Sequence, residues 1–316
     1  MDLTCEITTI DTGFVRPGFD ASHLIVEGGE AAFVDVGVSH SVPVLREALK
    51  QHQVAPENVK YLILTHIHLD HAGGAGVFLQ ELPNAQVVVH PKGARHLIKP
   101  ERLIQGSMAV YGEERFRTYF GEVLPIPAER VIEAHHEDRL SLNGRELEFL
   151  DTPGHARHHV CVVDEKSRGI FTGDTFGLSY RDFDTLNGPF IFPATAPVHF
   201  DPENMHETID LLISYQPKKM YLTHFGCVEG VSRLADEMHE LIDLFAAVAQ
   251  RVDGMNDEQR HLSLIEEITQ LLVVRLKTHG CTLPEERITE LLLTDITLNA
   301  QGLTVWLDRN RPKQAS

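Results

Sequence analysis

The chain has 316 residues, of which 28 are Lys or Arg and 46 are Asp or Glu, so its formal net charge is −18 with histidine neutral. This length predicts two domains or one large domain, and an apolar fraction of 42% is enough for a sizeable core. Nucleic acid and anionic membranes would repel so acidic a chain, so we expect neither as a partner. A small-molecule substrate is expected instead. The unusual count is 19 histidines.

The N-terminus lacks a basic region followed by an apolar run, which favours a cytoplasmic protein without a signal peptide. The longest stretch without Asp, Glu, Lys or Arg, residues 185–200, is too short to span a bilayer and contains three prolines. The cysteines form no CxxC pair, which argues against a disulfide framework or a cysteine zinc site and agrees with a reducing compartment. They are Cys5, Cys161, Cys227 and Cys281.

Up to about residue 230, short runs rich in Val, Ile, Leu and Phe alternate with helical segments. The expected strands are Leu24–Glu27, Ala31–Asp35, Val59–Leu64, Gln86–His90, Glu146–Asp151, Val160–Asp164 and Gly169–Thr172. The expected helices are Ser41–Gln53 and Ala72–Gln80, and the expected hairpin turns are Gly28-Gly29 and Asn143-Gly144. Strands interleaved with helices and hairpins predict a mixed α/β layered fold.

From residue 231 onward, apolar residues recur at helical spacing. The expected helices are Ser232–Val252, Asp257–Lys277 and Pro284–Leu298, with Asn256 as a start signal and Gly280 as a stop signal. We therefore predict two domains, residues 1–230 and a C-terminal helical region at residues 231–316. The apolar stripes of these helices are interpreted either as an internal core or as a homodimer contact.

A dense group of metal-ligating residues follows the apolar run that ends at residue 64. Where the chain is still extended, His66, His68 and Asp70 point to one side, because side chains alternate with period two. A turn at the start of the next helix then brings His71 toward the same centre. Three imidazoles and a carboxylate are donors that Zn²⁺, Fe and Mn accept, so this window predicts a metal site.

Three further strand ends carry matching side chains. His155 ends a Thr-Pro-Gly-His turn, Asp174 follows a Thr-Gly pair, and His224 follows Thr223. Ligands on loops that follow strand ends are what a rigid scaffold with one catalytic edge presents. Together these residues predict one site.

The order HxHxDH, TPGH, GD and TH, from about Asp35 to His224, resembles the metallo-β-lactamase superfamily. The resemblance implies an α/β fold, an αββα sandwich of the metallo-β-lactamase type with a C-terminal helical extension. It also implies the ligand sets: His66, His68 and His155 for one metal, Asp70, His71 and His224 for the second, and Asp174 as the bridge.

This resemblance implies a binuclear metal centre with two divalent ions, Zn as the first choice and Fe or Mn as alternatives. The implied activity is that of a dinuclear metal-dependent hydrolase, in which a metal-bound hydroxide attacks an ester, thioester, lactone or similar bond of a small molecule. Asp70 would also orient the nucleophile or move its proton, and Asp35 would support the ligands. For Asp35, an ordinary acid at a strand-end turn is the alternative.

Other activities stay open on the same motifs. The motif set is similar to those of glyoxalase II and N-acyl-homoserine lactonases. The lactonases, however, have a tyrosine where Gly177 stands here, and the helical tail contains no recognisable glutathione-contact motif. A persulfide dioxygenase-like oxidoreductase is the alternative function, with a single iron on His66, His155 and Asp174. A non-catalytic metal-binding protein is a third alternative.

Two segments and three histidines are ambiguous. The aromatic loop Phe176–Phe200 either lines a substrate pocket or packs on the body, and Pro91–Phe120 is either a wall of the site or a helical surface. His158 and His159 either support the ligands or have structural or exposed roles, and His23 is expected near Asp35 without an assigned role.

Overall fold

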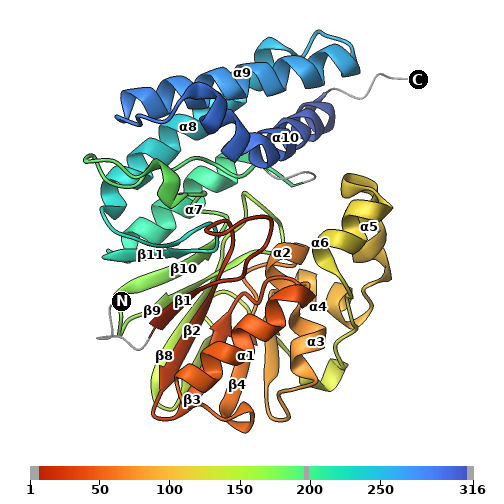
Figure 1. Ribbon diagram of the computed structural model, residues 1–316, viewed down its shortest axis with the longest axis vertical. Helices are drawn as coiled ribbons and strands as arrows, with labels where there is room; N and C mark the ends of the chain where they lie inside the picture. Colours follow the sequence, from red (N-terminus) through yellow and green to blue (C-terminus); the bar gives the residue numbers. More distant parts are fainter. Residues whose placement is uncertain (1–6, 196–198, 312–316) are drawn as a thin grey trace. The chain divides into compact units, whose positions relative to one another are not determined.

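The computed structural model describes residues 7–195 and 199–311 (Figure 1). Cys5 and part of the predicted aromatic loop fall outside these residues. By its internal contacts the chain divides into two compact units. The first comprises Met1–Thr152, His158–Gly173 and Pro217–Glu229, and the second comprises Pro153–Arg157, Asp174–Gln216 and Gly230–Ser316.

The first unit contains two six-stranded sheets. The first sheet has the order β1(Ile7–Asp11), β2(Ala21–Glu27), β3(Glu30–Val34), β4(Val59–Ile63), β5(Gln86–Val89) and β6(Val131–Glu133). The second has the order β12(Gly226–Val228), β11(Lys219–Leu222), β10(Gly169–Gly173), β9(Val160–Asp164), β8(Arg145–Asp151) and β7(Arg139–Leu142). β3, β4, β5 and β6 are parallel to one another, so three successive chain crossovers place their carboxyl ends at one edge.

Alternation along β3 divides the core of this unit into two layers. Ala31 and Phe33 pack with buried residues of α1(Val42–Gln51), α3(Ala75–Leu79) and α4(Pro91–Ile98). Ala32 and Val34 face the other way, toward buried residues of the second sheet such as Phe149. The two sheets therefore pack face to face, and helices cover the outer face of the first, as α1 does over β3 and β4 in Figure 1.

All seven predicted strands are present, with bounds shifted by a few residues at most. Gly28-Gly29 joins β2 to β3, and Asn143-Gly144, with φ of 47° and 87°, joins β7 to β8, so both predicted hairpins are confirmed. The helix predicted over residues 72–80 is present as α3, but the expectation that it begins at residue 72 is wrong. α2(Leu69–Ala72) and α3 are separate, because the amide of Gly74 donates to the carbonyl of Gly37 instead of continuing the first helix.

The sequence patterns missed the short strands β1, β6, β7 and β12, whereas the strand end expected before His224 is present as β11. Each has three to five residues and depends on a paired neighbour, so its own pattern is too short to recognise. Residues 91–120 form α4, α5(Glu101–Tyr111) and α6(Glu113–Phe120), which agrees with the helical interpretation of that segment. Short 3₁₀ helices occur at Ser39–Ser41, Pro56–Asn58, Ala128–Arg130 and Arg181–Phe183.

The second unit is built on α7(Pro202–Ser214), α8(Val231–Arg251), α9(Asp257–Thr278) and α10(Glu285–Asn310). Asn256 caps α9, because its side chain accepts from the amide of Gln259 at 3.0 Å, and Gly280 follows the helix with a φ of 96°. α10 runs twelve residues beyond its predicted end at Leu298, because apolar residues such as Leu303 keep packing inward.

The apolar stripe of α9 is an internal core, since Leu264, Ile268 and Leu272 are fully buried within the chain. The predicted boundary near residue 230 lies where the first compact unit ends, at Glu229. Residues 174–216 group with the C-terminal helices by contact. The division into domains 1–230 and 231–316 stays a prediction.

Candidate metal centre

Four of the predicted ligands follow β4 in a single short segment. His66 and His68 lie in the extended stretch after the strand, where His66 Nε2 and His68 Nδ1 are 2.8 Å apart. Asp70 and His71 belong to α2, which already begins at Leu69. The expectation that Asp70 continues the extended run is therefore wrong, because the amide of His71 already donates to the carbonyl of His68, as in a first helical turn.

Asp35 is a fully buried hydrogen-bond acceptor at the end of β3. Its carboxylate accepts from the amide of Thr65 (2.8 Å), the hydroxyl of Thr65 (2.8 Å), the hydroxyl of Thr223 (2.7 Å) and Nδ1 of His71 (2.7 Å). Each threonine immediately precedes a predicted ligand. Because hydrogen bonds to a carboxylate are strong and these are shielded from water, Asp35 fixes two ligand-bearing segments relative to one another, the one after β4 and the one after β11.

Three imidazoles have their ring orientation fixed through Nδ1. The bonds run from His71 to the carboxylate of Asp35 (2.7 Å), from His155 to the carbonyl of Ala194 (2.9 Å) and from His224 to the carbonyl of Phe19 (2.7 Å). A carbonyl or carboxylate oxygen only accepts, so Nδ1 carries the proton in each ring. The lone pair of each neutral ring is then on Nε2, which is how histidine is prepared as a metal ligand.

These Nε2 atoms lie near carboxylate oxygens. His224 Nε2 is 3.6 Å and His71 Nε2 is 3.9 Å from Oδ2 of Asp70, and His155 Nε2 is 3.6 Å from Oδ2 of Asp174. Such separations are too long for hydrogen bonds. Donor atoms that share a tetrahedral ion at about 2.0–2.2 Å lie roughly 3.3–3.6 Å apart, so the two separations of 3.6 Å fit ligands of a common cation and the third, 3.9 Å, is slightly longer.

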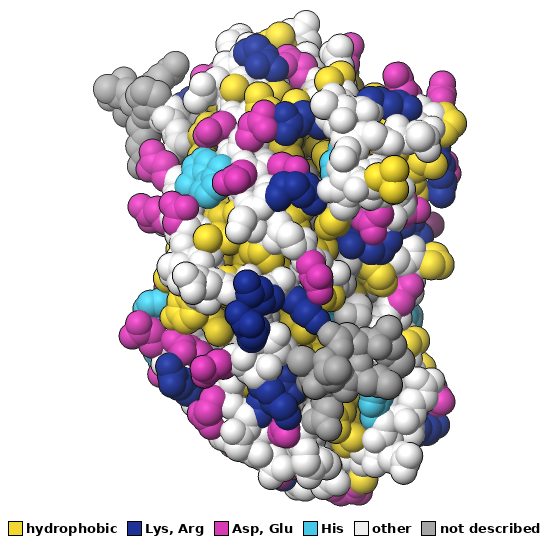
Figure 2. All heavy atoms as spheres, turned by 90° about the vertical axis from the view of Figure 1, so that its left-hand side faces the viewer, with side chains coloured by type: hydrophobic (Ala, Val, Ile, Leu, Met, Phe, Trp, Pro, Cys, Tyr) yellow, Lys and Arg dark blue, Asp and Glu magenta, His cyan; other side chains and the backbone are white. Residues whose placement is uncertain are grey.

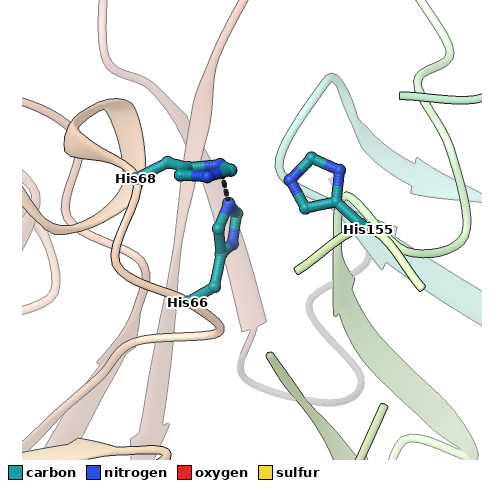
Figure 3. A group of neighbouring side chains, drawn as sticks. All are labelled: His66, His68 and His155. Carbon is teal, nitrogen blue, oxygen red and sulfur yellow. Dashed lines mark hydrogen bonds between the residues drawn. The ribbon is translucent and has the colours of Figure 1, made fainter. Parts of the chain in front are cut away.

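The seven predicted ligands fall into three groups whose donor atoms all lie within 4.8 Å of one another. The groups are His66, His68 and His155; His66, His71 and Asp174; and Asp70, His71 and His224. The first and third groups contain the same residues as the two predicted metal sets, and the assignment of these residues as ligands stays a prediction. The second group contains Asp174 with one histidine from each set, and the bridging role of Asp174 stays a prediction. Figure 3 shows the first group, with the His155 ring facing the bonded rings of His66 and His68.

His158 and His159 lie against the ligands. The ring of His66 stacks on that of His159 at 5.1 Å between centroids and on that of His158 at 6.2 Å. Gly173, with a φ of 47°, closes this side, because a Cβ there would lie 2.5 Å from the hydroxyl of Thr65 and 2.6 Å from Nε2 of His159. Of the two interpretations of His158 and His159, contact with the ligand histidines is therefore the one the structure supports.

Asp20 is a second buried carboxyl beside the centre, and no sequence motif singles it out. It is fully buried and its Oδ2 accepts from the hydroxyl of Thr12 at 2.6 Å. Burial raises the pKa of Asp20 to about 8, although the neighbouring His224 and His71 act to lower it. A divalent cation beside these histidines would stabilise the ionised carboxylate further.

Sequence reasoning also missed Thr65 and Thr223, although the chain carries a signal for them. The tripeptide Leu-Thr-His occurs at residues 64–66 and again at residues 222–224, after β4 and after β11. In both copies the histidine is a predicted ligand and the threonine hydroxyl donates to Asp35. The carbonyls of Phe19 and Ala194 had no such signal, because any residue can supply a backbone acceptor.

His23 lies in the core between the two sheets rather than among the ligands. Its ring packs against Phe171 and Tyr221 at 5.4 and 5.6 Å, and its Nε2 donates to the carbonyl of Leu222 at 3.0 Å. Burial lowers the pKa of His23 to about 4, an effect that the hydrogen bond only partly offsets. This histidine is therefore a neutral core residue.

The aromatic side chains of residues 176–192 are core residues of the second unit. The ring of Tyr180 is fully buried, and its hydroxyl donates to the carboxylate of Asp295 on α10 at 2.9 Å. Asn299, one turn further along α10, accepts from the amide of Thr195 at 2.6 Å. The other buried rings are Phe176, Phe183, Phe190 and Phe192. The packing interpretation of this loop is therefore supported over the pocket-wall interpretation.

A family model described as the metallo-beta-lactamase superfamily matches residues 15–224. The chain belongs to this superfamily. A metallo-beta-lactamase fold-containing protein of Sulfurisphaera tokodaii is 29% identical over 210 residues, which cover 64% of this chain and 76% of that protein. A hydroxyacylglutathione hydrolase of Xanthomonas euvesicatoria is 31% identical over 189 residues, which cover 58% of this chain and 55% of that protein.

An atrochrysone carboxyl ACP thioesterase of Aspergillus chevalieri is 28% identical over 164 residues, covering 51% of this chain and 41% of that protein. This chain thus spans about half the length, or less, of the two relatives that are named as enzymes. Among solved structures, an archaeal metallo-beta-lactamase superfamily protein from Sulfolobus tokodaii has a TM-score of 0.61 and 26% identity. The match covers 74% of this chain and 84% of that one.

These comparisons confirm the predicted fold class of the metallo-β-lactamase superfamily. The prediction of a metallo-β-lactamase superfamily hydrolase is likewise confirmed at the level of the superfamily. The reaction, the identity and number of the metals, and a cytoplasmic location stay predictions. In the part of the chain that the structure describes, we find no helix with the length and apolar character needed to cross a membrane.

Proposed function

We propose that this chain is a dinuclear metal-dependent hydrolase that cleaves an ester, thioester or lactone bond of a small molecule. The observation that carries the proposal is the preparation of the histidines: His71, His155 and His224 each have Nδ1 bound to a fixed acceptor and Nε2 close to a carboxylate. Purely structural histidines would not require this arrangement, and here it occurs at three of the predicted ligands.

The proposed ligand sets are those that the sequence predicted. His66, His68 and His155 would hold one ion, Asp70, His71 and His224 would hold the other, and Asp174 is the proposed bridging carboxylate. Two bound divalent cations would supply an activated water, by lowering its pKa to about 7, and positive charge for the developing oxyanion.

The protein's own residues then position the reactants and move the proton. Asp35 and the carbonyls of Phe19 and Ala194 hold the imidazole rings in one orientation through Nδ1. The side chain of Asp70 is 21% exposed, whereas those of Asp174 and His71 are 8% and 0% exposed. Asp70 is therefore the carboxylate of the set with access to solvent, and we assign to it the transfer of a proton between the site and water.

Thioesters are the first substrate class to test, because the relatives named as enzymes are a hydroxyacylglutathione hydrolase and an ACP thioesterase. The test is to quantify the metals of the purified protein and then to assay thioesters, lactones and phosphodiesters. We expect about two divalent ions per chain and hydrolysis of thioesters or lactones. Asp70→Asn should lower turnover at saturating substrate, whereas His261→Gln on α9 is a matched control that should not.

Two results would contradict the proposal. About one iron per chain with thiol-dependent O₂ uptake would instead indicate the persulfide dioxygenase alternative on His66, His155 and Asp174. Two bound ions with no hydrolysis of any substrate class would instead indicate a non-catalytic metal-binding protein.

A small-molecule substrate, the absence of nucleic acid and membrane partners, a cytoplasmic location and a possible homodimer remain proposals. The charge of −18 supports the first two. On the face drawn in Figure 2, acidic and basic side chains are intermixed, and no basic tract suited to a polyanion stands out. Fractionation, electrophoretic mobility-shift assays and sedimentation at several concentrations test these proposals directly.

A further inference from the structure

A second group of histidines and aspartates lies on two neighbouring helices of the second unit. α7 carries His206 and Asp210, α8 carries His239 and Asp243, and Figure 1 shows the two helices side by side. In each helix the aspartate follows the histidine by four residues, so both side chains lie on one face of that helix. None of the four residues belongs to the metal centre described above.

The two imidazoles meet edge to edge. His206 Nδ1 and His239 Nδ1 are 2.6 Å apart, the ring planes differ by 7° and the ring centroids are 4.9 Å apart. A nitrogen lies about 1.15 Å from the centroid of its ring, so these numbers describe nearly coplanar rings whose Nδ1 atoms point at each other.

The opposite edge of each ring faces a carboxylate from the other helix. His206 Nε2 is 3.2 Å from Oδ1 of Asp243, and His239 Nε2 is 3.3 Å from Oδ1 of Asp210. Because a carboxylate accepts, it holds the proton of each ring on Nε2. The Nδ1 lone pairs of both rings are then directed into the same space, where a proton or a cation must lie between them.

We propose that this crossed arrangement is a binding site for a divalent transition-metal ion, held by Nδ1 of His206 and Nδ1 of His239. Imidazole nitrogen suits Zn, Cu and Ni, and a carboxylate on the far ring nitrogen is the usual support of a metal-binding histidine. The charge also matches, since two neutral rings and two aspartates together carry −2.

The geometry requires only a small adjustment. Two nitrogens on a tetrahedral zinc ion at about 2.0–2.1 Å are roughly 3.3 Å apart, so the rings must separate by about 0.7 Å. The histidine side chains are 28% and 30% exposed, which leaves room for this movement and a route for the ion from solvent. Water completes the coordination on the exposed side.

The bound ion joins α7 to α8 at a point next to a structural support of His155. Gly154, with a φ of 129°, lies against the backbone of Met205, the residue before His206, and a Cβ on it would lie 2.6 Å from Cα of Met205. The hydroxyl of Thr208, also on α7, donates to the carbonyl of Pro153 at 2.7 Å. The ion therefore stabilises the helix that holds this turn, and we assign it a structural role.

The test is to count zinc ions bound per chain after equilibration with Zn²⁺ alone and removal of excess ion. Compared with wild type, the double variant His206→Gln/His239→Gln should bind one ion fewer per chain. His261→Gln, which removes a partly exposed histidine on α9, should bind as many ions as wild type. Because the result is a difference between variants, it does not depend on how many ions the other site holds or on whether the chain is a hydrolase.

A second pair of variants guards against loss of folding. Asp210→Asn and Asp243→Asn keep both imidazoles and should weaken binding of the additional ion about 10–100-fold. Their circular dichroism should match wild type, because the aspartate side chains are 78% exposed. Equal zinc counts in wild type and the folded double variant, or unchanged affinity in both aspartate variants, would overturn the proposal and leave the histidines as a pair that shares a proton.

Discussion

The chain holds two groups of histidine and aspartate that differ in what surrounds them. The carboxylate of Asp35 and the donors it accepts from are buried, whereas Asp210 and Asp243 are 78% exposed. Water can replace a lost hydrogen bond in the second group but not in the first. The same residue types therefore form a preorganised centre in one place and an adjustable link between two helices in the other.

The largest effect should come from the ligand proposed to lie between the two metals. Asp174→Ala should remove at least one ion and nearly all turnover, because Asp174 is the carboxylate that groups with one histidine of each predicted set. Metal analysis and kcat/KM measure this, with Asp182→Ala, an exposed aspartate of the following loop, as the control. Retained turnover would mean that the bridge is misassigned.

The second largest effect should come from removal of Asp35, and it should appear in the stability of the protein. Asp35→Ala leaves the hydroxyls of Thr65 and Thr223 and Nδ1 of His71 without their shared acceptor in the interior. We expect the free energy of unfolding to fall by about 3–5 kcal/mol, measured by urea denaturation of the metal-free protein. Asp35→Asn should lower the free energy of unfolding less, since the asparagine side chain keeps one acceptor oxygen. A loss below about 1 kcal/mol for Asp35→Ala would show that the acceptor is not needed to hold these segments.

A pH dependence separates buried from exposed histidines. The pKa of His23 is about 4 in the folded chain and 6.5 in the unfolded chain, so the unfolded chain binds the proton more readily. The stability contributed by neutral His23 is fully present above about pH 6.5 and is lost as the pH falls toward 4. At pH 5 the loss amounts to about 2 kcal/mol. His23→Gln should reduce that acid-dependent loss, and an unchanged slope between pH 7.5 and 5 would contradict it.

The smallest effect should come from the exposed group. In metal-free protein, Asp210→Ala should change the free energy of unfolding by less than about 1 kcal/mol, because exposed ion pairs contribute little. Urea denaturation beside Asp35→Ala makes the comparison direct. A loss as large as that of Asp35→Ala would remove the distinction between the two groups.

Local sequence patterns were enough to predict much of the fold and the residues of the candidate metal centre. The hairpin at Asn143-Gly144, the cap at Asn256 and the strand Val160–Asp164 were predictable because each has a clear signal in its own residues. The break between α2 and α3 was not, because it depends on a carbonyl at Gly37, more than thirty residues earlier. Short strands such as β6 and β12 form only through their partners, so no pattern of their own marks them.

The sequence alone determined the predicted ligand types, their order and the superfamily, because all three depend only on the residue types and the order of the motifs HxHxDH, TPGH, GD and TH. Only the tertiary structure decided what orients those ligands: the shared acceptor at Asp35 and the carbonyls of Phe19 and Ala194. It also decided that His206 faces His239. The physical reason is that a hydrogen bond between distant residues depends on where the backbone places them, and a backbone carbonyl leaves no mark on the amino-acid sequence.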